Sequence, residues 1–403
     1  MKYVVFLGDG MADYPIAALD GKTPLEAAKH PAMDELARRG TLGLARTIPN
    51  GMPKGSDVAN LSVMGYDPKS CYSGRSPFEA VNIGVQLDAT DVTYRCNLVT
   101  LSGSEHVENA VMADYSAGEI SSDEAAQLIE LMNERFEDAA TRFYPGVSYR
   151  HCLVLKDAKD GALLTPPHDI SGKPVRDYLP SGEHGSMLNG MMEYAYSVLR
   201  DSPVNKARVS QGKNPANCVW FWGEGRKPIL PSFEQKYGVR GGVISAVDLL
   251  HGIGRCAGLR SIHVPNVTGN YHTDFAAKGR AAIEALSTDC DFVYIHVEAP
   301  DECGHHGELP EKVWSIEQID SKIVVPVMQY LDNSTEDYAV LLMPDHPTPI
   351  SILTHADDPV PFALYRKGDS GGCARRFTEA DASATGVFKE RAHELMDQLM
   401  MGR

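Results

Sequence analysis

The chain has 403 residues, of which 43% are hydrophobic and 23% charged, and its formal net charge at pH 7 is −16. This length suits two domains, or three, with a sizeable core, and no apolar run approaches the roughly 18 residues that a membrane helix needs. The negative charge argues against nucleic acid or an anionic membrane as a partner, because a long-range negative field repels polyanions.

The N-terminus and the cysteines bear on the compartment. The apolar run from Tyr3 to Leu7 is too short for the core of a signal peptide. The eight cysteines are scattered without a C-x-x-C pair, which predicts free thiols. We therefore expect a cytoplasmic protein. Small anionic substrates remain compatible with the acidic chain, since a few cations can make the electrostatic potential positive locally. Assembly into a homo-oligomer is also possible.

The first third of the chain begins with a predicted strand over residues 2–7 and an amphipathic helix over residues 24–39. The strand is a continuous run of apolar and β-branched residues. Runs of this kind are typical of strands buried on both faces of a parallel sheet. We expect residues 1–90 to form the first part of an α/β core.

The middle of the chain has a different pattern. Apolar and polar residues alternate over residues 92–103, 147–157 and 161–166, as in half-exposed antiparallel strands. Helices are expected over residues 121–142 and 182–200. The segment 200–217 has the Pro, Asn, Ser and Gly content of a linker. The sequence therefore predicts an inserted, smaller α+β domain over residues 91–215.

The last part of the chain, residues 216–403, returns to the first pattern. Apolar strands are predicted over residues 242–247, 291–298, 338–344 and 361–366, and helices over residues 275–287, 310–331 and 379–400. This alternation predicts a doubly wound α/β fold with a mostly parallel sheet, interrupted by the insert.

Three of the predicted core strands are followed by carboxylate and imidazole side chains. These side chains are Asp9 after the first strand, Asp301 and His305 after 291–298, and Asp345, His346 and His355 after 338–344. A single aspartate after a strand is usually a turn former or a helix N-cap. Ligands of open α/β sheets, however, bind at the carboxyl ends of the strands, where these six residues would meet. We interpret His296, within the strand, as a buried core residue.

The mixed donor set indicates a metal site. Carboxylate and imidazole ligands together suit Mn²⁺ or Zn²⁺, and Mg²⁺ less well. Six candidate ligands are enough for two neighbouring ions. We therefore predict two divalent metal ions at this rim, with the glycines around Asp9 allowing a tight turn.

A candidate nucleophile lies in MPKGSDVANLSVMGYDP, residues 52–68. Ser56 stands at the start of a predicted helix, where an N-cap is the ordinary role. As a nucleophile it would gain from the helix N-terminus and from metal coordination. The chain lacks a G-x-S-x-G elbow, a G-x-x-x-x-G-K-[ST] loop and a G-x-G-x-x-G fingerprint. Acyl transfer and a non-catalytic nucleotide-binding module are therefore disfavoured.

Taken in order, these motifs resemble a known family. Asp9, KGSD, DECGHHG and PDHPTP follow the order of the alkaline phosphatase superfamily. GDGMAD, GKTPLEAA, NLSVMGYDP, YSGRSPFEA and HADDPVPF are similar to the cofactor-independent (2,3-bisphosphoglycerate-independent) phosphoglycerate mutases of archaeal type. The resemblance runs from residue 1 to about residue 364 and includes the insert.

The resemblance implies ligand sets and a reaction. One ion would be held by Asp9, Ser56, Asp345 and His346, and the other by Asp301, His305 and His355. Ser56 would carry the phosphoryl group as a phosphoserine while 3-phosphoglycerate and 2-phosphoglycerate interconvert. The insert would close over the glycerate and exclude water.

The motifs say less about which residues bind the substrate and which molecule accepts the phosphoryl group. An anionic substrate needs guanidinium partners, and the candidates are Arg75, Arg226, Arg95 and Arg150, together with the acid Asp114. Lys54 and Ser76 depart from the small or proline residues usual in the archaeal enzymes. A homoserine kinase of the same family, with ATP as donor, is therefore the alternative, and a metal-dependent phosphatase a third.

Overall fold

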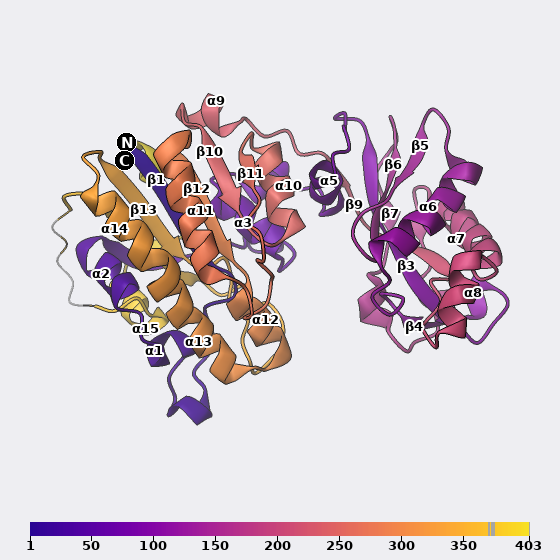
Figure 1. Cartoon of the computed structure of the whole chain (residues 1–403), viewed down its shortest axis with the longest axis horizontal. Coiled ribbons are helices and arrows are strands. Elements are labelled where there is room, and N and C mark those ends of the chain that lie inside the picture. Colours follow the sequence, from indigo (N-terminus) through magenta and orange to yellow (C-terminus); the bar gives the residue numbers. More distant parts are fainter. Residues whose placement is uncertain (370, 372–374, 403) are drawn as a thin grey trace. The chain divides into compact units, whose positions relative to one another are not determined.

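The computed structural model describes residues 1–369, 371 and 375–402, and the chain divides into two compact units (Figure 1). The first unit consists of Met1–Tyr72 and Leu230–Arg403, and the second of Ser73–Ile229. Cys373 lies outside the described residues, and the cysteines within them are free thiols. Among the described residues, no helix has both the length and the apolar character needed to cross a membrane.

The first unit is built on one sheet. Its strands are β1 (Lys2–Gly8), β2 (Thr41–Ala45), β10 (Gly241–Ile244), β11 (Arg260–Ile262), β12 (Phe292–Val297), β13 (Tyr338–Met343), β14 (Val360–Arg366) and β15 (Phe388–Lys389). Their order within the described residues is β11-β10-β12-β1-β13-β14-β2-β15. All pairs from β11 to β13 are parallel, whereas β14 is antiparallel to both β13 and β2. The predicted mostly parallel α/β sheet is confirmed.

Helices cover both faces of this sheet. They are α1 (Pro24–Ala27), α2 (Pro31–Arg39), α3 (Ser56–Val63), α4 (Pro68–Cys71), α9 (Phe233–Tyr237), α10 (Asp248–Cys256), α11 (Phe275–Thr288), α12 (Ala299–His306), α13 (Leu309–Ile319), α14 (Val325–Asn333), α15 (Glu379–Ser383) and α16 (Glu394–Met401). On one face, Val4 and Phe6 share a core with Leu286 of α11 and Val327 of α14 (Figure 1). On the other, Tyr294 donates a hydrogen bond to Asn60 of α3. Burial on both faces explains why these strands are continuous apolar runs.

The second unit has an antiparallel sheet. Its strands are β3 (Val92–Ser102), β4 (Val111–Asp114), β5 (Thr141–Tyr144), β6 (Arg150–Leu155) and β9 (Cys218–Arg226), with β7 (Ala162–Leu163) and β8 (Ser181–Gly182) forming a separate pair. Its helices are α5 (Ser76–Asn82), α6 (Ser122–Phe136), α7 (Gly185–Leu199) and α8 (Pro203–Ser210). Residues of β3, α6, α7 and β9 share one core, so this unit has its own interior.

The second unit extends beyond the predicted insert, residues 91–215, at both ends. β9 pairs with the part of β3 from Val92 to Val99, and α5 also packs on β3, so both belong with the insert. The predicted linker over residues 200–217 contains α8, which Ser202 caps through a hydrogen bond to the backbone N–H of Asn205. Turn-forming residues before and within α8 made the segment look irregular.

Three predicted helices are wrong in length. The helix expected over residues 121–142 ends at Phe136, and Thr141 already belongs to β5. The helix expected over residues 24–39 is divided into α1 and α2, because Pro31 removes a backbone donor and begins a new helix. The helix expected over residues 379–400 is replaced by α15, β15 and α16. Gly386, with φ of 71°, allows the turn between α15 and β15.

Candidate metal centre

The carboxyl ends of three adjacent parallel strands bring the predicted ligands together. Asp9 follows β1, and Asp345 and His346 lie just after β13. Asp301 and His305 belong to α12, which begins just beyond β12, and His355 lies between β13 and β14. Because β12, β1 and β13 are neighbours, their ends meet at one edge of the sheet. Ser56, the first residue of α3, reaches the same place.

The first group of side chains is centred on His346. Its Nε2 atom lies 3.5 Å from Asp9 Oδ1, 3.4 Å from Asp345 Oδ2 and 3.1 Å from Ser56 Oγ. Asp9, Asp345 and His346 are all buried. Each offers a ligand atom within 4.8 Å of those of the other two, a spacing that a single ion can bridge.

The second group is centred on Asp301. Its Oδ2 atom lies 3.3 Å from His305 Nε2, and its Oδ1 atom lies 3.4 Å from His355 Nε2. The two Nε2 atoms are 2.9 Å apart. The ligand atoms of Asp301, His346 and His355 also lie within 4.8 Å of one another, so His346 stands between the two groups.

Hydrogen bonds at the far side of each imidazole fix its tautomer. His305 Nδ1 lies 3.1 Å from the carbonyl oxygen of Leu353, and His355 Nδ1 lies 2.9 Å from that of Lys54. A carbonyl only accepts, so Nδ1 carries the proton in both rings. The hydroxyl of Thr348 donates to Asp301, which leaves its oxygen to accept from His346 Nδ1 at 3.2 Å.

In their neutral forms, all three rings therefore turn an Nε2 lone pair toward the aspartates. Two such lone pairs 2.9 Å apart repel each other unless a cation or a proton lies between them. In addition, Asp9 Oδ1 is buried and has no hydrogen-bond partner among the described residues. These atoms fit one or more metal ions, for which a lone pair and an unpaired carboxylate oxygen are the required donors.

The electrostatics of the cluster also favour cations. Burial raises the pKa of Asp9 well above its usual value, and the charges of Asp345 and Asp301 raise it further. Burial also raises the pKa of Asp301. The protonated forms of His305 and His355, however, donate hydrogen bonds to Asp301 that outweigh burial and hold its pKa well below the usual value. The neighbouring carboxylates thus oppose the ionisation of Asp9, and divalent ions would relieve this repulsion.

Three further residues contact or adjoin the predicted ligands and were missed by the sequence analysis. Asn60 donates from Nδ2 to Asp345 Oδ2 at 2.8 Å, and Glu298 offers an oxygen near those of Asp9 and Asp301. His296, interpreted as an ordinary core residue, contacts Asp9 Oδ2 through Nε2 at 2.8 Å. A histidine within an otherwise apolar strand was the available signal for this contact. Asn60 and Glu298 had no comparable signal in the sequence.

The predicted substrate-binding residues lie in the second unit and divide into two kinds. Arg75 Nε and Arg95 Nε each lie 2.9 Å from a carboxylate oxygen of Glu79. Burial raises the pKa of Glu79, but the charges of Arg95, Arg75 and Arg150 outweigh it and lower that pKa overall. Three guanidinium groups around one carboxylate leave a surplus of positive charge, which suits an anion.

Arg226 and Asp114 have structural partners instead. The Arg226 guanidinium donates to the carbonyl oxygens of Thr90 and Ala158 and pairs with Asp160. Asp114 accepts hydrogen bonds from the Ser116 and Gly118 backbone and from Asn214. These contacts tie both side chains to other parts of the second unit.

The comparisons with known proteins agree on one family. A family model described as 2,3-bisphosphoglycerate-independent phosphoglycerate mutase matches residues 37–205. A protein of that name from Methanothrix thermoacetophila is 50% identical over 402 residues, which are 100% of this chain and 100% of the relative. The chain belongs to this phosphoglycerate mutase family.

Two solved structures extend the likeness. The PH0037 protein from Pyrococcus horikoshii has a TM-score of 0.79 at 29% identity, over 99% of this chain and 96% of its own. The cofactor-independent phosphoglycerate mutase from Thermoplasma acidophilum has a TM-score of 0.67 at 27% identity, over 99% of each chain. The family suggested by the sequence motifs is thereby confirmed.

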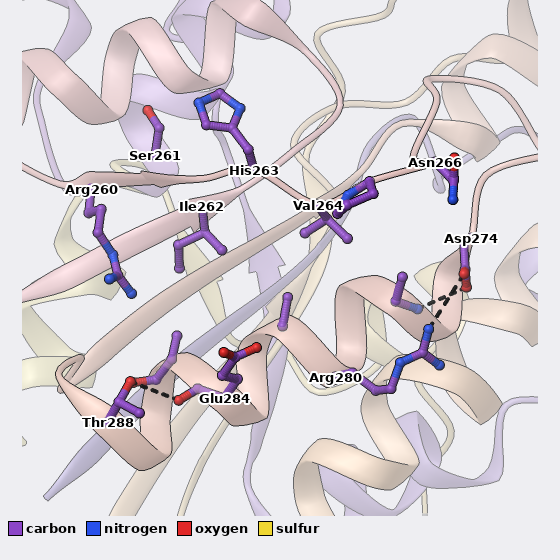
Figure 2. Close-up of a pocket in the computed structure, with 14 residues that line it drawn as sticks. Arg260, Ser261, Ile262, His263, Val264, Asn266, Asp274, Arg280, Glu284 and Thr288 are labelled. Carbon is purple, nitrogen blue, oxygen red and sulfur yellow. Dashed lines mark hydrogen bonds and ion pairs between the residues drawn. The ribbon is translucent and has the colours of Figure 1, made fainter.

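A large surface groove lies outside the cluster. It has a volume of about 560 Å³ and lies between β11 and α11 (Figure 2). Two arginines at its walls are ion-paired, Arg280 with Asp274 and Arg260 with Asp289. None of the predicted ligands lines this groove, and we assign it no ligand.

Proposed function

We propose that this chain interconverts 3-phosphoglycerate and 2-phosphoglycerate through a phosphoserine at Ser56. One observation carries the proposal: Ser56 Oγ lies 3.1 Å from His346 Nε2, within reach of a buried cluster of aspartates and histidines. The names of the relatives, which are 2,3-bisphosphoglycerate-independent phosphoglycerate mutases, support the choice of reaction. The enzyme would therefore act on a small phosphorylated substrate.

We assign two divalent ions to the cluster, with Mn²⁺ or Zn²⁺ preferred to Mg²⁺ because three donors are imidazoles. Asp9, Ser56, Asp345 and His346 would hold one ion, and Asp301, His305 and His355 the other. The inward Nε2 lone pairs and the unpaired Asp9 Oδ1 support this assignment. When bound, the ions would neutralise the phosphoryl oxygens and favour the ionised hydroxyl of Ser56.

The chain's own groups account for the transfer. Ser56 Oγ forms a bond to phosphorus, the bond from phosphorus to O3 of the glycerate breaks, and the serine hydroxyl proton passes to O3. In the second step O2 forms a bond to phosphorus, the bond from phosphorus to Ser56 Oγ breaks, and the O2 proton returns to Ser56 Oγ. The N-terminus of α3 stabilises negative charge on Ser56 throughout.

We assign the guanidinium groups of Arg75, Arg95 and Arg150 to the carboxylate of the glycerate. Their shared excess of positive charge around Glu79 supports this role. We further propose that the second unit serves as the cap that holds the glycerate between the two steps and excludes water.

A direct assay tests the proposal. With Mn²⁺ and no nucleotide, the protein should interconvert the two phosphoglycerates, followed by ³¹P NMR, without release of inorganic phosphate. Ser56→Ala should lower turnover by at least about 10³-fold, because it removes the nucleophile. Ser70→Ala, at an exposed serine of the same unit whose hydroxyl bonds the Asp67 backbone, should leave turnover unchanged.

Two other results would replace the mutase with another activity. Phosphorylation of homoserine by ATP, without phosphoglycerate turnover, would favour the homoserine kinase. Steady release of inorganic phosphate from phosphoglycerate would favour a phosphatase.

A further inference from the structure

A short chain of hydrogen bonds lies beyond Asp9, on residues that carry no predicted role. His296 in β12 is fully buried, and its Nε2 lies 2.8 Å from Asp9 Oδ2. Its Nδ1 lies 3.1 Å from Ser245 Oγ, just after β10. Because β10 and β1 both pair with β12, the parallel sheet brings these three residues side by side.

The direction of each hydrogen bond follows from Ser245. Its Oγ accepts the backbone N–H of Val247 at 2.9 Å, so its own proton is free to be donated to His296 Nδ1. The His296 proton is then on Nε2, where it is donated to Asp9 Oδ2. The reverse tautomer would place an Nε2 lone pair against a carboxylate oxygen.

The surroundings hold this arrangement in place. Lys278 Nζ donates to the backbone oxygen of His296 at 3.0 Å, and His251 Nε2 lies 3.1 Å from the backbone oxygen of Ser245. Lys278 and His251 are both buried, so neither bond competes with bulk water. The positions of both His296 and Ser245 are thus fixed through the main chain as well as the side chain.

These hydrogen bonds determine which oxygen of Asp9 is available to a ligand. Its Oδ2 is occupied by His296, whereas its Oδ1 has no hydrogen-bond partner in the described part of the chain and faces His346 Nε2 at 3.5 Å. We propose that His296 and Ser245 are positioning residues that orient Asp9 so that Oδ1 alone is offered to the metal ion held with Asp345 and His346. This inference rests on the proposed two-metal site.

A positioning role and a merely structural role predict different variants. A glutamine side chain has its amide nitrogen the same number of bonds from Cα as histidine Nε2, so it can donate to Asp9 Oδ2. Leucine has a similar volume and no donor, which leaves Oδ2 free to turn toward the ion. If His296 only fills space, both variants should bind metal alike.

The test is titration calorimetry of the metal-free, full-length protein with Mn²⁺ alone, with thermal unfolding of each variant as a check on folding. Outer hydrogen-bond partners of metal ligands typically contribute about 10–100-fold to metal affinity. His296→Leu should therefore lower the affinity for one of the two Mn²⁺ ions by about that factor. His296→Gln should stay within about threefold of the unmodified chain. Ser245→Ala should lower the affinity for the same ion by a smaller factor. Ser245→Thr keeps the hydroxyl group and should keep the affinity of the unmodified chain.

A matched control removes a different buried histidine. His30 contacts the backbone oxygen of Leu25 and the carboxylate of Asp34, and neither of these residues is a predicted ligand. His30→Leu should therefore lower the unfolding temperature and leave both Mn²⁺ affinities unchanged.

The outcomes separate this inference from the proposed function. Equal Mn²⁺ affinities in the unmodified chain and in His296→Leu, or equal losses in His296→Leu and His296→Gln, would overturn the positioning role. If His296→Leu does not fold, the Mn²⁺ affinities of Ser245→Ala and Ser245→Thr are compared instead. Equal affinities in these two variants would overturn the positioning role. Absence of any Mn²⁺ binding by the unmodified chain would overturn the metal centre itself and this inference with it.

Discussion

At the scale of single residues, the second unit offers two arginines with opposite environments. Arg150 is exposed at the start of β6, its guanidinium carbon is 5.3 Å from the centre of the Tyr149 ring, and its charge acts on Glu79. Arg226 instead bonds two backbone carbonyls and Asp160. If Arg150 binds the substrate and Arg226 holds a loop, removal of the two charges should have different effects.

Arg150→Met should therefore raise the KM for 3-phosphoglycerate by about tenfold or more, because a charge-assisted hydrogen bond contributes about 1.5–3 kcal/mol. Arg226→Met should lower the unfolding temperature and leave KM within about twofold, since it removes three internal contacts. Steady-state kinetics and thermal unfolding of both variants provide the measurement. A larger rise in KM for Arg226→Met than for Arg150→Met would reverse the assignment.

Residue types at strand ends were sufficient to predict the cluster. Asp9, Asp301 and Asp345 each follow an apolar strand, and neighbouring parallel strands must deliver them to one edge. The roles of Asn60 and Thr348 could not be predicted, because each depends on a contact with a residue far away in the sequence. The substrate-binding role of Arg226 was predicted from its glycine-rich loop. A loop of this composition does not reveal which groups the arginine side chain contacts.

At the scale of elements, the turn after β1 determines how closely α12 approaches the sheet. Gly10 has a φ of 61°, and a Cβ atom placed there would lie 2.6 Å from the Cα of Asp301. Its backbone N–H also points at Asp345 Oδ1, 3.3 Å away. The glycine therefore permits both the turn and the close packing of the segments that contain Asp9 and Asp301.

Gly10→Ala can be compared with Gly21→Ala. Gly21 has a φ of 79°, but apart from Gly21 and its two chain neighbours no described residue has a heavy atom within 4 Å of the place that an added methyl group would take. Gly21→Ala should cost about 1 kcal/mol of unfolding free energy, the strain of a left-handed alanine. Gly10→Ala should cost about 1–3 kcal/mol more, because the methyl group meets the Asp301 backbone, and should also weaken Mn²⁺ binding. Urea unfolding and Mn²⁺ titration check both effects, and equal losses of stability would contradict the close-packing argument.

At the scale of the whole molecule, the alternation of apolar strands and amphipathic helices was enough to predict the doubly wound sheet. The bounds of the second unit were harder to predict. β9 follows the irregular segment around α8, and it pairs with β3, which lies more than 100 residues earlier in the chain. The chain's net charge of −16 gives no hint of either charged site. One proposed site is a buried set of carboxylates, whose charge favours cations, and the other is a group of arginines, whose charge favours anions.

The phosphoserine at Ser56 is tested most sharply by a rapid-quench experiment with 3-phosphoglycerate labelled in its phosphoryl group, in the presence of Mn²⁺. We predict that the label appears on Ser56 before 2-phosphoglycerate accumulates, and that Ser56→Ala carries none. Formation of labelled 2-phosphoglycerate by the Ser56→Ala variant at the rate of the unmodified chain would contradict a phosphoserine at this residue.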